Sequence, residues 1–271
     1  TVVVVLVAAI VECILVSVFH TGDLYHLFID SISSLFARMG DTAWTGLLFI
    51  VVSTLLWFFG IHGSDVLEGA AAMQFTPATA LNQVAVATGS GTPQIVTKAF
   101  LNSFVFMGGC GAALCLLIAL LLFARRSSNR TLARVAALPM VFNVNEIMIF
   151  GLPVIYNPWL FVPFLATPVM AFLVAYGATA AGLVPVTTTV VEWTCPVIIS
   201  GWISTGSPTG AILQVVIIAI GVCIYAPFVK KYDLAQREEG HDRLDQLVAQ
   251  LQRSEDTPSP SGSRRFPAQA A

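Results

Sequence analysis

Long apolar segments dominate the chain. A helix that spans a membrane needs roughly 20 mostly apolar residues, and five stretches meet this requirement. Over 23–38, apolar residues recur at helical spacing among polar ones, which predicts an amphipathic helix lying on the membrane surface. The pattern therefore predicts an all-α integral membrane protein. The five predicted spanning helices cover about 1–19, 43–61, 101–124, 158–183 and 209–229.

Three apolar stretches, 86–111, 143–164 and 183–208, are interrupted by Gly and Pro. Backbone groups that such breaks leave unpaired cannot face lipid, so these stretches must be buried in protein or line a wet cavity. Interrupted hydrophobic segments often mark the binding site of a transporter. We therefore predict re-entrant or broken helical hairpins that enclose a site.

Charge is scarce and unevenly distributed. Only 10% of the 271 residues are charged and 56% are hydrophobic, whereas about a quarter of a soluble domain is charged. Of 13 basic and 15 acidic residues, seven of each lie in 230–271, which leaves six and eight for 1–229. The last segment is predicted to be helical to Gln252 and disordered from Ser254. The chain has no basic face that would indicate a nucleic-acid partner.

Basic residues follow two of the predicted helices, with four arginines in 125–134 and a lysine pair at 230–231. The positive-inside rule places both segments, and with them the C-terminus, in the cytoplasm. The chain opens at Thr1 inside an apolar run without a charged n-region, so we interpret it as starting within a longer protein rather than at a signal peptide. The five cysteines lack metal-ligand spacing, and we predict no metal and no cofactor.

Few ionisable residues lie deep in apolar sequence, where a charge costs roughly 2.5–3.5 kcal/mol or more. Glu146 is the strongest candidate, because it ends the run Asn143-Val144-Asn145-Glu146 between apolar neighbours. Amides supply donors and acceptors and a carboxylate supplies a strong acceptor, which together suit sugar hydroxyls. The same side chains could instead secure a helix break. Glu12 could pair with a segment outside the chain.

Other candidates have two interpretations of comparable weight. His62 lies in Gly60-Ile61-His62-Gly63, where the glycines permit close approach of a ligand, but it could also simply end a helix. Trp193 and Trp202 could stack on a sugar ring or anchor at the membrane interface. Thr194 and Pro196 place Trp193 in a broken segment, which favours stacking. Lys98 either snorkels to the interface or lines the cavity.

The central motif resembles that of a known family. The run Leu138–Glu146, followed by Phe150-Gly151-Leu152-Pro153, is similar to the signature of the enzyme IIC subunit of the phosphoenolpyruvate-dependent sugar phosphotransferase system. The resemblance is to the lactose/cellobiose/diacetylchitobiose branch, and it extends in the family's order across about 43–232. Supporting matches are Gly60–Gly63, Gly108–Gly111, Trp193–Pro196 and Ile224–Phe228.

The resemblance implies a bacterial inner-membrane permease, multi-pass, that binds a disaccharide. A IIB subunit, supplied by IIA, then phosphorylates the sugar, and the full-length protein forms a homodimer within membrane lipid. The chain itself has no recognisable phosphoryl-carrier loop, so whether it counts as an enzyme is left open. The implied catalytic residues are Glu146 and His62. The implied sugar-binding residues are His62, Asn143, Asn145, Glu146, Trp193 and Gly109.

The family also implies a division of the chain. Residues 1–42 would be the end of a scaffold domain, 43–232 the sugar-transport domain and 233–271 a cytoplasmic tail, helical and then disordered. Two positions depart from the family pattern: Ile147 and Glu192 each stand where the family usually has Pro. These departures leave the sugar open, and they leave room for a sensory module that signals through the helix at 230–252. An unrelated secondary transporter would need a coupling-ion site, and no acidic pair within one helix supplies one.

Overall fold

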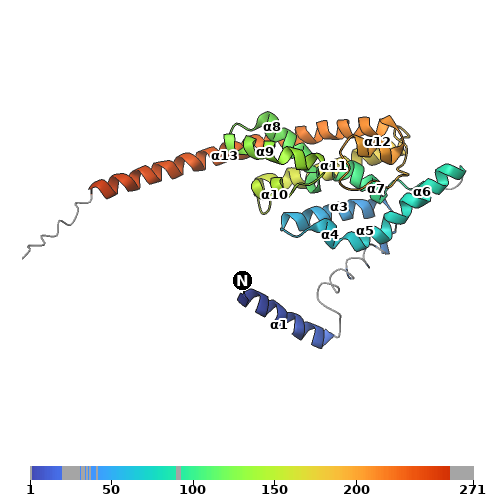
Figure 1. Cartoon of the computed structure of the whole chain (residues 1–271), viewed down its shortest axis with the longest axis horizontal. Helices are drawn as coiled ribbons and strands as arrows, with labels where there is room; N and C mark the ends of the chain where they lie inside the picture. The colour runs from blue at the N-terminus through green and yellow to red at the C-terminus, as the bar shows by residue number, and fades with distance from the viewer. Residues whose placement is uncertain are drawn as a thin grey trace, which may run out of the picture.

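The chain is described from a computed structural model, in which all regular structure of the described residues is helical (Figure 1). The described residues are 2–19, 31, 34, 36, 38–40, 42–89 and 93–256, with side chains described up to 237 apart from those of 2, 4, 8, 15 and 19. Most of the predicted amphipathic helix over 23–38, and the tail from 257, lie outside them. The helices in the first half are α1 (Val2–Phe19), α3 (Ala43–Phe58), α4 (Gly63–Val66), α5 (Glu68–Gln74), α6 (Thr76–Thr88), α7 (Lys98–Phe100), η1 (Leu101–Val105) and η2 (Cys110–Ala112). Those in the second half are α8 (Ala113–Phe123), α9 (Ser127–Val141), α10 (Glu146–Gly151), α11 (Pro158–Ala180), α12 (Ile199–Thr205) and α13 (Pro208–Asp256).

Three stretches of the described chain are long and apolar enough to cross a membrane: Lys98–Phe123, Pro158–Ala180 and Pro208–Arg237. Two shorter apolar helices, Val5–Val18 and Ala43–Phe58, fall at the other predicted spans. All five predicted segments are therefore helical. The third predicted span, 101–124, falls at Lys98–Phe123, and the chain breaks between η1 and α8 at the glycines that also interrupt the predicted broken stretch 86–111.

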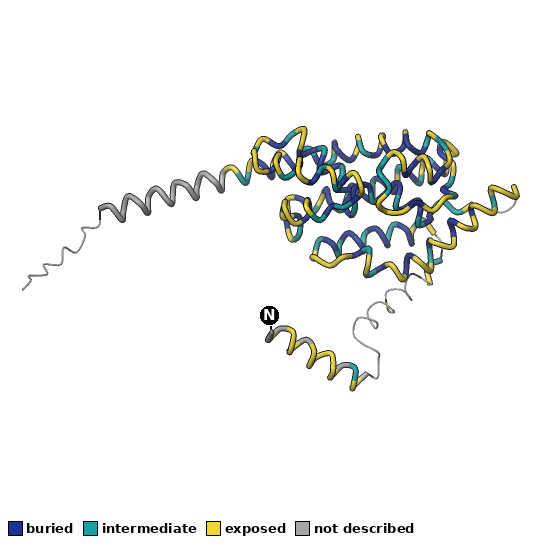
Figure 2. The backbone as a smooth tube through the Cα atoms, viewed as in Figure 1, coloured by how far each residue is buried: buried dark blue, intermediate teal, exposed yellow. Residues whose placement is uncertain are grey.

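The bundle is built around α13, which packs against both α8 and α11, with α3 against α11 (Figure 1). Its interior is apolar, and large fully buried side chains such as Phe104, Phe164 and Tyr225 fill it. Apolar side chains also cover the outside of the bundle. They include Leu122 on α8, Leu173 on α11 and several residues of α13. An apolar exterior suits lipid rather than water. Figure 2 shows the buried backbone concentrated in this bundle, whereas α1 lies apart and is mostly exposed.

The chain leaves the bundle through α13, which continues from the apolar span without interruption to Asp256. Asp233 on this helix is buried and accepts hydrogen bonds from the backbone N–H groups of Arg125 and Arg126 at 2.9 and 3.2 Å. It also accepts one from Asn129 Nδ2 at 3.0 Å. A carboxylate at the start of α9 satisfies donors that a helix leaves free. The basic turn before α9 is thus fixed to α13.

Gln214, in the apolar part of α13, forms hydrogen bonds with backbone groups at the break before α12. Its Oε1 accepts from the N–H groups of Ile198 and Gly201 at 2.7 and 3.0 Å. Its Nε2 donates to the Ser103 carbonyl at 2.5 Å and to Ser200 Oγ at 2.9 Å. One fully buried amide therefore pairs groups from η1, α12 and the loop before α12, as unpaired backbone at membrane depth requires.

Replacing Gln214 with Leu should destabilise the protein by about 2–5 kcal/mol, because the buried Gly201 N–H, the buried Ser103 carbonyl and the partly buried Ile198 N–H lose their partners, and each buried group costs roughly 1–3 kcal/mol. We expect a clear fall in the thermal unfolding midpoint of the detergent-solubilised full-length protein. Gln83 on α6 is exposed, so Gln83→Leu is the matched control and should unfold like the wild type. Equal midpoints for the two variants would contradict this role.

Candidate functional site

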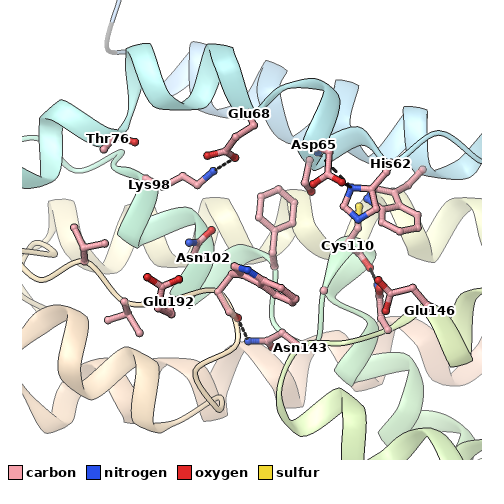
Figure 3. A pocket seen from close by; sticks show the side chains of 18 of the residues that line it. His62, Asp65, Glu68, Thr76, Lys98, Asn102, Cys110, Asn143, Glu146 and Glu192 are labelled. Atoms are coloured by element: carbon pink, nitrogen blue, oxygen red, sulfur yellow. Dashed lines mark hydrogen bonds and ion pairs between the residues drawn. The ribbon is translucent and has the colours of Figure 1, made fainter.

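A cavity of about 630 Å³ lies where the broken segments meet (Figure 3). Its size falls within the range of ligand pockets. Its wall is formed by α3 to α6, by η1 and the break that follows, by the α9–α10 turn and by the loop at 190–193. All six residues predicted to bind sugar line it: His62, Gly109, Asn143, Asn145, Glu146 and Trp193.

Glu146 is the first residue of α10 and follows the break at Asn145. Its Oε2 is buried and has no hydrogen-bond partner among the described residues. An unpaired buried acceptor is costly unless something binds it. Because the side chain lines the cavity, a ligand hydroxyl is a suitable partner. The alternative that Glu146 secures the helix break finds no hydrogen bond to support it.

His62 precedes α4 and is oriented by two neighbours. Its Nδ1 accepts a hydrogen bond from the Asp65 backbone N–H at 3.3 Å and so caps α4, in line with the alternative that His62 ends a helix. The same Nδ1 lies 3.0 Å from Asp65 Oδ2, and the ring lies against Trp57 with centroids 4.3 Å apart. When Nδ1 instead carries the proton, it gives up the capping bond and donates to the carboxylate, which leaves Nε2 as an acceptor. Sequence reasoning placed Asp65 near His62 but not in the site; the spacing of three residues was the available signal.

Asn143 joins two walls of the cavity. Its Oδ1 accepts from the Gly108 N–H at 2.7 Å, and its Nδ2 donates to the carbonyls of Trp193 and Cys195 at 2.6 and 3.0 Å. Its φ of 62° is left-handed, which Asn tolerates better than most residues. Both ends of the amide are therefore occupied by backbone. Sugar binding by Asn143 stays a prediction, whereas these hydrogen bonds support the alternative that Asn143 secures the backbone at a break.

The glycine break lets the chain pass close to Asn145. Gly109 has a φ of 87° and a ψ of −168°, a combination that essentially only glycine adopts. A Cβ atom there would lie 2.5 Å from Asn145 Nδ2, which itself donates to the Cys110 carbonyl at 3.3 Å. Gly109 thus allows the break to pack directly beside the residue that precedes Glu146.

The loop at 190–193 carries Glu192 and Trp193 to the same cavity. Trp193 is half-exposed, at 55%, while its carbonyl is held by Asn143. A fixed backbone with a free indole suits stacking on a sugar ring. Trp202 does not line the cavity and is 56% exposed on α12, which leaves the membrane interface as the better interpretation of that residue.

A second group of polar side chains lines the cavity away from His62 (Figure 3). Lys98 Nζ donates to Glu68 Oε2 at 2.5 Å, so Lys98 lines the cavity rather than snorkelling. Asn102 lies on the π-helix η1, and π-helical turns are frequent at functional sites. We call this group the Lys98 end of the cavity and the opposite group, with His62, Asp65 and Glu146, the His62 end. The Lys98 end consists of Glu68, Thr76, Lys98, Asn102 and Glu192.

Apolar helices whose broken segments enclose a polar cavity are the arrangement found in membrane transporters with discontinuous helices. Residues 1–168 match the family model described as "Phosphotransferase system, EIIC", and the chain belongs to that family. The resemblance inferred from the central motif is thus confirmed.

Curated relatives and a solved structure support the same family assignment. The chain is 34% identical to the lichenan permease IIC component of Bacillus subtilis over 75% of its length and 46% of the relative. It is 31% identical to the cellobiose-specific EIIC component of Geobacillus stearothermophilus, over 74% and 46%. The transporter ChbC, the IIC component of an N,N'-diacetylchitobiose-specific system, superposes with a TM-score of 0.72 at 32% identity, over 88% of this chain and 56% of ChbC. The chain spans about half the length of the curated relatives it matches.

Proposed function

We propose that the protein containing this chain is the sugar-translocating component of a phosphotransferase system and takes a β-linked disaccharide. The observation that carries the proposal is the cavity, in which the unpaired Glu146 carboxylate and the oriented His62 imidazole face the same space. Support for the sugar class comes from relatives named for lichenan, oligo-β-mannoside and cellobiose. These relatives are permease components, which favours a permease over a sensory module.

In this proposal the His62 end holds the hydroxyl that receives the phosphoryl group. Glu146 Oε2 accepts a hydrogen bond from that hydroxyl and can take its proton as a general base. His62, oriented by Asp65, makes a second hydrogen bond, and Trp193 stacks on the ring. Phosphoryl transfer depends on positioning and on charge stabilisation, and the fixed walls supply the positioning.

The phosphoryl donor is a IIB partner, itself supplied by IIA. Three relatives are named lactose-specific EIICB components, a name that combines the IIC and IIB designations. We place the turn before α9 and the continuation of α13 on the cytoplasmic side, because basic residues gather there. A homodimer, with lipid around the apolar exterior, completes the assembly.

The test is to express the full-length protein with its IIA and IIB partners and to measure phosphoenolpyruvate-dependent phosphorylation of β-linked disaccharides in membrane vesicles. We expect the sugar to reach the side of the membrane that holds IIB only in its phosphorylated form. Sugar that binds but is never phosphorylated in the presence of active partners would overturn the proposal.

A further inference from the structure

Basic side chains gather where α8 ends, at the end of the bundle from which α13 continues (Figure 1). Asp233 on α13 accepts from the backbone N–H groups of the turn after α8, so the two segments are fixed together. It is buried, and it is the single carboxylate in 124–141 and 230–237. The exposed charge here is therefore positive. We call this set the basic cluster, and it consists of Arg125, Arg126, Arg130, Arg134, Lys230 and Lys231.

The basic cluster lies at the boundary of the apolar bundle. The apolar helix α8 ends at Phe123, and Lys230 Nζ lies 4.6 Å from the centroid of the Phe123 ring. Arg125 follows Phe123 by two residues. Long basic side chains at the end of a spanning helix place their charges among the lipid headgroups. The depth of the cluster is therefore that of a phospholipid headgroup.

Half of the cluster already has partners within the protein. Arg126 Nη1 donates to a carbonyl of α13 at 3.1 Å, Arg130 Nε donates to the carbonyl at the end of α8 at 2.6 Å, and Lys230 lies over Phe123. The N–H groups at the start of α9 are satisfied by Asp233, so an anion must bind through side chains. Three cations are exposed and form no hydrogen bond or ion pair with any side chain or carbonyl that the structure describes: those of Arg125, Arg134 and Lys231.

The exposed face of α9 changes along the helix from basic to apolar. Asn143, just after α9, accepts from the Gly108 N–H before α8, so α9 runs back along α8 from the boundary to the depth of the cavity. Arg134 comes first on this face, and Val135 and Leu138 follow, 60% and 72% exposed. Helical side chains tilt toward the N-terminus, which here is the boundary. The Arg134 charge can therefore reach the headgroups while Leu138 lies at the depth of acyl chains.

We propose that the basic cluster and the apolar residues of α9 below it form a binding site for an anionic phospholipid. The negative headgroup pairs with Arg125, Arg134 and Lys231, and an acyl chain lies against Leu138. Three unpaired cations favour a headgroup with net negative charge over one whose ammonium group cancels its phosphate. A soluble protein could pair with the cations but would leave Leu138 uncovered, which favours a lipid as the occupant.

The test measures lipid binding to the purified full-length protein in detergent by native mass spectrometry. The probes are phosphatidylglycerol and phosphatidylcholine with identical acyl chains. We expect phosphatidylglycerol to bind at least about tenfold more tightly. Arg125→Gln, Arg134→Gln and Lys231→Gln should each weaken its binding about fivefold, with phosphatidylcholine binding unchanged. The fold should persist, because none of the three side chains has a hydrogen-bond partner among the described residues.

Arg38→Gln is the matched control, since Arg38 is exposed and lies outside the basic cluster, and it should bind both lipids like the wild type. Equal affinity of the wild type for the two lipids would overturn the inference. It would also be overturned if the three cluster variants bound phosphatidylglycerol like the wild type but lost affinity for a IIB protein, because the basic cluster would then be a protein-docking surface.

Discussion

Glu146→Gln should reduce sugar phosphorylation by about 10²–10⁴-fold, the contribution typical of a positioned general base. Glutamine keeps the size of the side chain and can still hydrogen-bond a hydroxyl, but it cannot take up a proton at this step. The Kd for the sugar should therefore change much less than the rate. The measurement is phosphoenolpyruvate-dependent phosphorylation in vesicles of the full-length protein, beside equilibrium binding to the same preparation.

Glu12→Gln serves as the control, because it removes one carboxylate from an exposed position on α1. We expect it to phosphorylate sugar at the wild-type rate. Unaltered uptake and phosphorylation in Glu146→Gln would refute the assignment of Glu146 as the base. A variant that loses binding and rate together would show that the carboxylate holds the sugar rather than activating it.

Asn143→Asp should weaken both the fold and the site, although it changes one atom. The carboxylate can still accept from the Gly108 N–H, but it cannot donate to the Trp193 and Cys195 carbonyls, 2.6 and 3.0 Å from the present Nδ2. Two lost hydrogen bonds and the resulting repulsion between oxygens should cost about 2–4 kcal/mol. We expect a lower unfolding midpoint and sugar binding weakened by more than about tenfold, because Trp193 is released.

Asn157→Asp is the corresponding change at a place where it should be tolerated. Asn157 Oδ1 accepts from the Trp159 N–H at the start of α11 at 3.0 Å, and an aspartate fulfils that role with a favourable charge. This variant loses one donated bond, to the Pro153 carbonyl. If Asn143→Asp proved as stable and as active as Asn157→Asp, the joining role of Asn143 would be wrong.

Much of the architecture follows from local sequence. An apolar run as long as Pro158–Ala180 satisfies its backbone hydrogen bonds in lipid by forming a helix, so the length of the apolar runs was enough to locate these helices. The polar run ending at Glu146 and the glycines around His62 likewise identified two parts of the cavity wall. These signals lie within a few residues of the groups they predict, and the structure brings those groups to one cavity.

What could not be predicted depends on contacts between distant residues. Gln214 is a single amide inside an apolar helix, and its partner Ser103 lies 111 residues away. Asn82 similarly donates to the Thr187 carbonyl, 105 residues away. A single amide in an apolar run indicates that its side chain is buried, but the neighbouring sequence does not identify its hydrogen-bond partner. The Lys98–Glu68 pair was missed for the same reason, as 30 residues separate its members.

The amide of Asn143 also has a consequence for how the protein is made. Its partners at Trp193 and Cys195 are synthesised about 50 residues after it, and contacts of such separation form late because loop closure must come first. A nascent chain that has inserted only as far as α11 therefore has Glu146 and His62 but no closed wall around them. If the protein binds sugar as proposed, the site is complete only after the loop that carries Trp193 and Cys195 has been added, and bound sugar then stabilises the closed arrangement.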